Sequence, residues 1–540
     1  MYQPVLHFDR KCVIMQFMLI KILERRIFFM DILAFSLYFV AMIAIGIFFF
    51  VKSKNVSEKD YFLGGRAMGP WVTAMSAQAS DMSAWLLMGL PGSILAFGFG
   101  QAWIGIGLAI GTAANWILVA KRLRKFSKAA GDSITLPQYL SNRFATKSHT
   151  VSIICAVVFL VCFTIYVASA FVAGADVFTT LVPQLSRTTA MLIFAAIVLV
   201  YTFLGGFNAV CWTDFFQGLL MLAALLIVPI VIGFTRTLDV AALSTVYTGP
   251  NGEEFKFVAS FMNASWQDII SGLGWGLGYF GMPHIIVRFM AIEKPSMVKK
   301  SATVAIIWVV LSLGAAIMIA YLGRMFVYAD GTDLSAVLLS QGQQSLIFVE
   351  LARDVFPAFI AGLLLAAIIA ASMSTADSQL LVAASSFASD LYKPIVRKNA
   401  SNKEMLWVSR MIVLIIAVIA FLIASSKGKA AQAIMDLVSN AWGIFGAAFG
   451  PAVLLSLFWK RFTYKGAVAG IITGALLDMI WLWLPLVNGM TLTAATGIYE
   501  IIPGFILGGL AAIVVTLIDK APSAEVEAIY ARATDNSIDD

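Results

Sequence analysis

Charged residues are scarce in this chain of 540 residues. Asp, Glu, Lys and Arg together make up 12% of it, 60% is hydrophobic, and the mean hydropathy is +0.90. A chain with so little charge cannot cover the surface of a soluble globular protein of this length. The composition therefore excludes a soluble enzyme and indicates a protein that crosses the lipid bilayer many times.

Histidine and cysteine are also rare. The chain has three histidines at widely separated positions and four cysteines without CxxC spacing. These absences argue against a metal cluster and against a redox pair, and the sequence shows no motif for a catalytic nucleophile. We therefore expect no enzymatic activity and no cofactor. His284, beside Pro283, is interpreted as a structural or lining residue rather than a proton carrier.

Apolar runs of about 20 residues, the length that an α-helix needs to span a bilayer, recur throughout the chain. We predict an all-α integral membrane protein with about thirteen transmembrane helices. The runs fall near residues 31–51, 71–91, 97–119, 151–174, 189–207, 212–234, 266–287, 302–323, 355–386, 407–425, 432–458, 466–485 and 498–518.

Lysine and arginine are concentrated in alternate connections between these runs. Basic clusters lie around residues 121–128, 288–300 and 393–403. Because Lys and Arg near the end of a span resist translocation, this side is predicted to be the cytoplasm. The first span then starts outside, and the tail 520–540 is cytoplasmic. The net charge of +7 is explained by loops that face anionic lipid, so no nucleic-acid partner is expected.

Residues 1–29 fit this topology badly, because they carry basic residues on the side that is predicted to have few. They also lack the charge order and the cleavage site of a signal peptide. Met30 precedes a clean span and is the natural start. We interpret residues 1–29 as a mis-assigned or peripheral extension, with a short interfacial helix as the alternative, and residues 30–519 as the main domain.

Asp81 lies in the middle of the second apolar run, where an unpaired carboxylate would cost roughly 2.5 to 3.5 kcal/mol or more. Small and hydroxyl residues surround it between Ser76 and Trp85. Three helix breakers follow, namely Gly89, Pro91 and Gly92. The pattern predicts a helix that is broken at mid-membrane to bind an ion or a polar solute.

The seventh run is also rich in helix breakers, with five glycines and a proline between Gly272 and His284. Close packing of helices through small residues is one explanation. The second and the seventh run, however, lead two consecutive groups of five spans. Interrupted helices at matching positions indicate inverted repeats around a site at the bilayer midplane. We predict these repeats at about 70–235 and 266–458.

Two further acids lie in apolar surroundings. Asp377 follows several hydroxyl residues in the ninth run, and hydroxyls with freed carbonyls are hard oxygen ligands for a small cation. Asp214 opens the sixth run after Gly205-Gly206-Phe207, and its main interpretation is an N-cap of that helix. A second-ion or gating role is the alternative for Asp214.

At these residues the chain resembles the sodium/solute symporter family, from Met30 to about Pro522. The likeness rests on an ordered set of motifs: Leu63-Gly64-Gly65-Arg66, Ala79-Ser80-Asp81-Met82-Ser83, Leu87-Met88-Gly89-Leu90-Pro91-Gly92, Phe163-Thr164-Ile165-Tyr166, Gly205-Gly206-Phe207, Trp212-Thr213-Asp214, Gly274-Trp275-Gly276-Leu277-Gly278-Tyr279-Phe280-Gly281 and Gly446-Ala447-Ala448-Phe449-Gly450-Pro451. The resemblance implies a secondary transporter with a LeuT-type 5+5 inverted-repeat core. It further implies a bacterial inner membrane, sodium as the coupling ion and the only metal, and no obligate protein partner.

The resemblance also implies roles for particular residues. The principal sodium site would use the carbonyls of Ala79, Met82 and Ala371 and the hydroxyls of Ser374 and Thr375. The implied substrate is L-proline, surrounded by Asp81, Ser83, Trp85, Tyr166, Trp275, Tyr279 and Pro283. Related members with a second sodium place it between the counterparts of Asp214 and Asp377-Ser378, which leaves a 2:1 stoichiometry open. Aromatic walls and half-helix ends suit a zwitterion with a compact apolar ring.

Two departures from the family pattern bear on the substrate. Ala84 replaces a glycine that proline-carrying members usually have, and its methyl group could narrow the pocket. Ala376-Asp377 replaces an uncharged pair. The alternatives are therefore a sodium symporter for another amino acid, pantothenate or a carboxylate. A solute sensor is a weaker alternative, because the tail is too short for a signalling domain.

Overall fold

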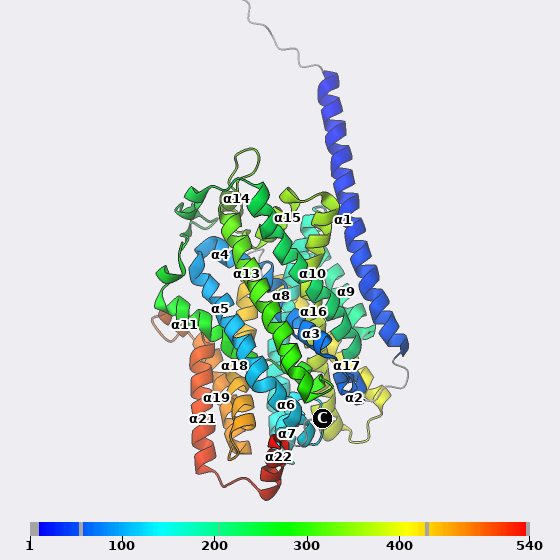
Figure 1. Cartoon of the computed structure of the whole chain (residues 1–540), viewed down its shortest axis with the longest axis vertical. Helices are drawn as coiled ribbons and strands as arrows, with labels where there is room; N and C mark the ends of the chain where they lie inside the picture. The colour runs from blue at the N-terminus through cyan, green and yellow to red at the C-terminus, as the bar shows by residue number, and fades with distance from the viewer. Residues whose placement is uncertain (1–9, 53–57, 205, 427–430, 536–540) are drawn as a thin grey trace, which may run out of the picture.

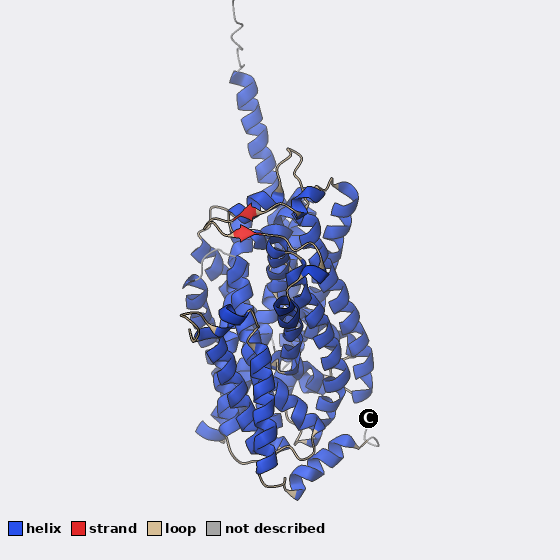
Figure 2. Cartoon of the chain, turned by 90° about the vertical axis from the view of Figure 1, so that its left-hand side faces the viewer, coloured by secondary structure: helices blue, strands red, loops and turns tan. Residues whose placement is uncertain are grey.

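The computed structural model describes residues 10–52, 58–204, 206–426 and 431–535, and helices dominate it (Figures 1 and 2). The prediction of an all-α protein is confirmed. The structure also has a small antiparallel pair of strands, β1 (Tyr247–Thr248) and β2 (Glu254–Phe255). The pair lies near the upper end of the bundle in Figure 2.

Ten of the described helices are long and apolar enough to cross a membrane. Their elements are α1 (Arg10–Lys52), α5 (Phe99–Ala114) continued by η3 (Asn115–Ala120) and α6 (Lys121–Ala129), α8 (Thr150–Leu181), α10 (Phe207–Thr235), η7 (Pro295–Met297) with α13 (Val298–Arg324), α16 (Ala358–Ser386) continued by η9 (Phe387–Val396), α17 (Asn402–Ser426), α18 (Ala431–Phe458), α19 (Tyr464–Trp483) and α21 (Ile501–Ile518).

Three predicted spans are outside this set. Those at 71–91 and 266–287 are interrupted, and the one at 189–207 forms α9 (Arg187–Leu204), whose apolar part is shorter. The count of thirteen spans stays a prediction. The remaining short elements are α2 (Glu58–Leu63), η1 (Gly64–Arg66), α7 (Leu136–Arg143), η4 (Val240–Leu243), η5 (Phe261–Asn263), α14 (Leu334–Ser340), η8 (Gln344–Leu346), α15 (Ile347–Val355), α20 (Leu492–Thr496) and α22 (Ala524–Thr534).

Both interrupted spans are broken where the sequence predicts it. The second span consists of α3 (Pro70–Met82), the short turn η2 (Ala84–Leu86) and α4 (Gly89–Phe97). The seventh consists of α11 (Trp266–Gly274), η6 (Trp275–Phe280) and α12 (Pro283–Ala291). Gly107 and Gly111 of α5 let η6 approach closely, because a Cβ on Gly111 would lie 2.4 Å from atoms of Gly276. The glycines of the seventh span thus agree with both explanations: they lie where the helix is interrupted, and they allow it to pack closely against α5.

The predicted N-cap role of Asp214 is wrong. Helix α10 begins at Phe207 after Gly206, so Asp214 lies two turns inside it and is fully buried. The helix extends further toward the N-terminus than the predicted run because Phe207 and Val210 of its first turn are apolar and buried. Gly205, part of the motif before this helix, lies outside the described residues. Asp214 therefore belongs to the interior of the bundle.

Helix α1 contains the first span and continues toward the N-terminus, where it projects beyond the bundle (Figure 1). Residues 10–29 are thus helical and continuous with the span, while residues 1–9 lie outside the described part. Asp31 is buried at the point where α1 meets the bundle, and Arg353 Nη2 of α15 lies 3.4 Å from its Oδ2. A start at Met30 stays a prediction.

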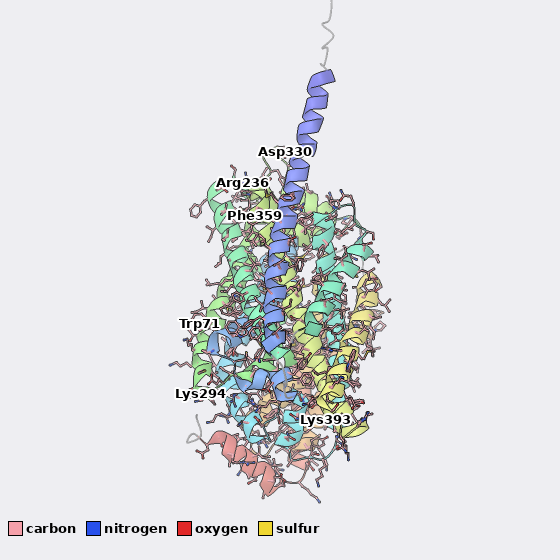
Figure 3. The ribbon with its side chains drawn as sticks, turned by 90° about the vertical axis from the view of Figure 1, so that its right-hand side faces the viewer. Trp71, Arg236, Lys294, Asp330, Phe359 and Lys393 are labelled. Atoms are coloured by element: carbon pink, nitrogen blue, oxygen red, sulfur yellow. The ribbon has the colours of Figure 1, made fainter. Side chains whose placement is uncertain are left out.

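Lysines from two of the predicted basic clusters lie at the same end of the bundle. Lys294 and Lys393 lie at one end, and Arg236 and Asp330 lie at the other (Figure 3). Helix α22 of the tail packs at the lysine-rich end, where Phe126 and Tyr530 make an edge-to-face contact with centroids 5.3 Å apart. The tail segment therefore docks on the bundle; residues 536–540 lie outside the described part.

Candidate functional site

The breaks of the two interrupted spans meet at Asp81. Helix α3 ends one residue after Asp81, and Ser83 adopts a φ of 44°, a conformation that residues with side chains rarely take. The Ser83 hydroxyl accepts a hydrogen bond from the Trp85 backbone N–H at 3.1 Å, which stabilises the turn. Asp81 is 4% exposed, and the Tyr279 hydroxyl donates to its Oδ2 at 2.6 Å. One charge-assisted hydrogen bond therefore joins the second span to the seventh.

Tyr166 of α8 approaches the same point from a third span. Its hydroxyl donates to the Asp81 carbonyl at 3.5 Å, a long bond. The His284 ring is fully buried and makes edge-to-face contacts with Phe163 and Tyr166, with centroids 5.8 and 6.4 Å apart. This position agrees with the prediction of a structural or lining residue. Asp81, Tyr166 and Tyr279 are thus brought together.

The predicted aromatic wall forms a stack. The Trp85 and Trp275 rings are stacked with centroids 5.5 Å apart, and Trp275 also stacks on Tyr499 at 5.1 Å. Trp442 of α18 donates from its indole N–H to the Trp275 carbonyl at 2.8 Å and meets Tyr279 edge-to-face. All of these rings are at most 7% exposed. An apolar ring of a solute could be held against this stack, because aromatic faces offer large apolar area with defined geometry.

Pro283 and Ala84 lie close to the two breaks. Pro283 is the first residue of α12, where its lack of an N–H costs nothing. Ala84 opens the turn η2 and is 2% exposed. A proline at the start of α12 fixes the direction of the second half-helix, whose N-terminal N–H groups point toward the break. Both half-helix ends therefore present backbone groups at the level of Asp81.

The predicted principal sodium ligands lie where α3 touches α16. The Ser374 hydroxyl donates to the Ala79 carbonyl at 2.9 Å and to the Ala371 carbonyl at 3.1 Å. The Thr375 hydroxyl is buried and has no hydrogen-bond partner among the described residues. Met82 is the last residue of α3, so its carbonyl has no partner further along that helix. These residues offer five oxygens in a region with little access to water.

A third cluster joins Asp214, Ser76 and Arg288, and the last of these was not expected there. The Arg288 guanidinium Nη2 lies 3.1 Å from Asp214 Oδ2, and its Nε donates to the Ser76 hydroxyl at 3.1 Å. Ser76 in turn donates to Asp214 Oδ2 at 2.7 Å. Arg288 Nη2 also donates to the Ser378 hydroxyl at 2.5 Å. The guanidinium therefore binds two members of the set that is predicted to hold a second sodium.

Asp377, the third member of that set, is fully buried, and neither of its carboxylate oxygens has a hydrogen-bond partner among the described residues. Asp214 Oδ1 also lacks a partner there. Two carboxylates with one guanidinium leave this cluster one positive charge short. A buried unpaired carboxylate is costly, so Asp377 favours a proton or a further cation.

The assignment of Arg288 to a cytoplasmic basic cluster is wrong, since Arg288 is 1% exposed and lies in α12. The sequence held a signal for this position: Arg288 stands between Ile285-Ile286-Val287 and Phe289-Met290-Ala291, and charged residues within apolar runs face a functional interior. Trp442 and Tyr499 were also missed. They carry no such signal, because an aromatic residue in an apolar span is ordinary.

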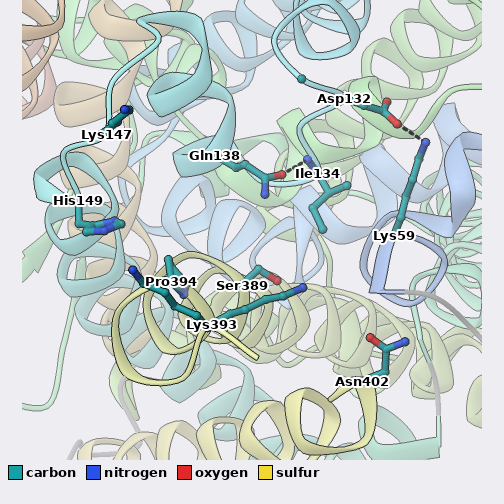
Figure 4. Close-up of a pocket in the computed structure, with 12 residues that line it drawn as sticks. Lys59, Asp132, Ile134, Gln138, Lys147, His149, Ser389, Lys393, Pro394 and Asn402 are labelled. Carbon is teal, nitrogen blue, oxygen red and sulfur yellow. Dashed lines mark hydrogen bonds and ion pairs between the residues drawn. The ribbon is translucent and has the colours of Figure 1, made fainter. Parts of the chain in front are cut away.

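A large cavity of about 990 Å³ lies elsewhere, at the lysine-rich end (Figure 4). Its lining includes Lys59, Asp132, His149 and Lys393. Figure 4 shows the Lys59 side chain reaching Asp132, with Lys393 across the cavity. The cavity contains none of the residues around Asp81, so it is a feature of the surface and not of the midplane site.

Broken helices that face each other around a buried acid define a class of protein, the secondary transporters with a midplane site. The model of the sodium:solute symporter family matches residues 61–474, and the chain belongs to this family. A solved structure of a sodium-coupled sialic acid symporter has a TM-score of 0.71 and 19% identity to this chain, covering 92% of it and 98% of that chain. The predicted LeuT-like fold is thereby confirmed, and the protein is a transporter rather than an enzyme.

Relatives in bacteria cover nearly the whole chain. The sodium/proline symporter of Escherichia coli K12 is 42% identical over 510 residues, covering 93% of this chain and 96% of the relative. The high-affinity proline transporter PutP of Bacillus subtilis 168 is 42% identical over 493 residues, covering 90% and 97%. The osmoregulated proline transporter OpuE of the same organism is 41% identical over 492 residues, covering 91% and 95%.

Proposed function

We propose that this protein takes up L-proline into a bacterial cell together with sodium, across the inner membrane, by alternating access. The observation that carries the proposal is the bond between Tyr279 and Asp81, which joins the two broken spans beside an aromatic stack. Relatives at 42% identity are named as a sodium/proline symporter and a proline transporter, which supports the same substrate. The lysine-rich end would face the cytoplasm, with the N-terminus outside and the C-terminus inside.

The substrate would be recognised by complementary charge and shape. Asp81 would attract the secondary ammonium of proline, and the half-helix ends would hold its carboxylate. The pyrrolidine ring would lie against Trp85 and Trp275, which now stack on each other and would have to separate. Tyr166, Tyr279, Ser83 and Pro283 would complete the surroundings.

Sodium would bind where Ser374 now donates to the Ala79 carbonyl. Rotation of this hydroxyl would free the oxygens of Ala79, Ala371 and Ser374 for the ion, with Thr375 and Met82 adding two more. Sodium at this point would fix the end of α3 against α16 and so complete the proline pocket. We propose residues 70–235 and 266–458 as the two inverted repeats that move around it.

A second sodium would compete with Arg288. The guanidinium already supplies one charge to Asp214 and Ser378, so an ion between Asp214, Asp377 and Ser378 would enter only when Arg288 withdraws. We infer that one sodium accompanies each proline in the conformation described here. One sodium moving down about 100 mV gains roughly 2.3 kcal/mol, and a tenfold sodium gradient adds about 1.4 kcal/mol. Together they support roughly 400-fold accumulation of a net-neutral solute.

The test is uptake of radiolabelled L-proline into proteoliposomes, with sodium outside and then potassium in its place. We expect accumulation that needs sodium and is competed by proline analogues alone. Uptake without sodium would contradict the coupling. No uptake of proline, with sodium-dependent uptake of pantothenate, a carboxylate or another amino acid, would contradict the substrate and direct attention to Ala84.

A further inference from the structure

A second pair of buried acids lies outside the transport core. Asp478 of α19 and Glu500, at the start of α21, are 0% and 2% exposed. Both touch Gly443 of α18, since a Cβ at Gly443 would lie 3.0 Å from Asp478 Oδ2 and 3.4 Å from Glu500 Cγ. The two acidic side chains therefore contact the same glycine between three helices.

Neither oxygen of Asp478 has a hydrogen-bond partner among the described residues. Glu500 accepts a hydrogen bond from the Thr493 hydroxyl at 3.0 Å. The titratable groups that face the pair are Asp436 of α18, Tyr499 and Cys162 of α8, and none of them is basic. Two carboxylates buried together without a cation are strongly disfavoured, so one positive charge is missing here.

Glu500, and the glycine that both acids contact, each directly follow an aromatic residue that touches Trp275. Tyr499, before Glu500, stacks on Trp275, and its hydroxyl donates to the Ser439 carbonyl at 2.7 Å. Trp442, before Gly443, donates to the Trp275 carbonyl. A change in the separation of α18 and α21 at Gly443 would therefore move two of the rings that hold Trp275.

We propose that Asp478 and Glu500 form a proton-binding site in which one proton is shared between the two carboxyl groups, and that this site is coupled to the substrate site through Tyr499 and Trp275. Glu500 is the better anion of the two, because it stands at the N-terminus of α21 and accepts from Thr493. The proton therefore resides on Asp478, and the resulting O–H group can donate a hydrogen bond to Glu500. Loss of the proton leaves two negative charges that repel each other and push α19 and α21 apart.

The KM for proline is expected to depend on pH through this proton. At low pH the site is protonated, and Tyr499 stays against Trp275. As the pH rises, the proton leaves and the wall around Trp275 loosens, so the KM for proline rises. The expected effect on the KM rests on the proposed function, whereas the presence of the proton does not.

The presence of the proton is tested by infrared spectroscopy on the full-length transporter in detergent. We expect a carboxylic-acid C=O band at about pH 6 that is weakened in Asp478→Asn and shifted in Glu500→Gln, which removes the carboxylate that accepts the Asp478 proton. The matched control is Asp519→Asn, which removes an acid at the opposite end of α21 that pairs with Lys465 at 3.0 Å and leaves the band intact. An identical band in wild type, Asp478→Asn and Glu500→Gln would overturn the proposal, as would a site filled by sodium, which gives no such band.

The coupling is tested by the KM for proline in proteoliposomes at saturating sodium. We expect the wild-type KM to rise about fivefold from about pH 6 to about pH 9, the lower end of typical couplings between sites. In Asp478→Asn, which keeps the shape and stays neutral, the rise is lost while the low-pH KM remains. The same rise in wild type and in Asp478→Asn would overturn the coupling. If proline is not carried at all, the infrared result still stands or falls on its own.

Discussion

The two groups of buried acids in this protein differ in what compensates their negative charge. In the core, Asp214 lies 3.1 Å from the guanidinium of Arg288, and hydroxyls of Ser76 and Ser378 complete the contacts. At the periphery, Asp478 and Glu500 have one hydroxyl, Thr493, and no basic side chain among the described residues acts on them. Asp214 thus has a cation that the protein itself supplies, while the peripheral pair must take one from solution.

This difference determines where an ion can be exchanged. An internal guanidinium cannot leave the protein, so it holds the core set in one arrangement until another cation replaces it. A proton can come and go, so the peripheral pair responds to the solution.

The largest effect is expected from Arg288→Ala. It leaves Asp214 buried without its partner, which typically costs about 3 to 5 kcal/mol. We expect a large fall in the unfolding temperature in detergent and transport reduced at least about 100-fold. Asp214→Asn in the same chain removes the orphaned charge and should recover most of the folding stability. Unaltered unfolding and uptake in Arg288→Ala would show that the guanidinium is not the internal cation.

The next effect concerns the ion that does exchange. Ser374→Ala combined with Thr375→Ala removes two hydroxyl oxygens from the proposed sodium site. Since a contact to a charged group is worth about 1.5 to 3 kcal/mol, we expect the sodium concentration for half-maximal uptake to rise tenfold or more. Ser372→Ala is the matched control, because its hydroxyl donates only to Ile368 of its own helix, at 2.9 Å. An unchanged sodium requirement would remove these hydroxyls from the site.

Tyr279→Phe tests the contact that joins the two broken spans. It deletes the 2.6 Å hydrogen bond to Asp81 and leaves the ring in place. A charge-assisted bond of about 1.5 to 3 kcal/mol corresponds to a rise in the proline KM of roughly 10-fold or more, measured at saturating sodium. Tyr166→Phe serves as comparison, because its bond to the Asp81 carbonyl is 3.5 Å long and neutral. Equal effects of the two substitutions would argue against a special role for the Tyr279 bond.

Much of this arrangement could be predicted from the sequence, because an acid or a run of glycines inside an apolar span has few explanations. Asp81 and the glycines after Gly272 locate the two breaks for that reason. The partner of Asp214 could not be found so directly. Arg288 stands among apolar residues, which indicates an interior position, but only the fold shows that it meets Asp214. Tyr499 lies beyond the repeats altogether, and no pattern along the chain relates it to Trp275.

Asp132 at the lysine-rich end gives the smallest effect and the sharpest contrast with Asp478. Arg66 Nε lies 2.9 Å and Lys128 Nζ 3.7 Å from its Oδ1, and Lys59 donates to its Oδ2. Partial burial by itself raises the pKa of Asp132. The hydrogen bond from Lys59 and the charges of Arg66 and Lys128 outweigh it, so the pKa of Asp132 is lowered.

A carboxyl group with a lowered pKa stabilises the folded state above the ordinary value of about 3.9, and this contribution is lost as the pH falls through the lowered pKa. Since the Asp132 side chain is 35% exposed, water and salt reduce the gain to less than about 1 kcal/mol. We expect Asp132→Asn to lower the unfolding temperature slightly at neutral pH and not at all in strong acid. A difference from wild type that grows on acidification would mean that Asp132 resembles the unpaired Asp478 rather than the paired Asp214.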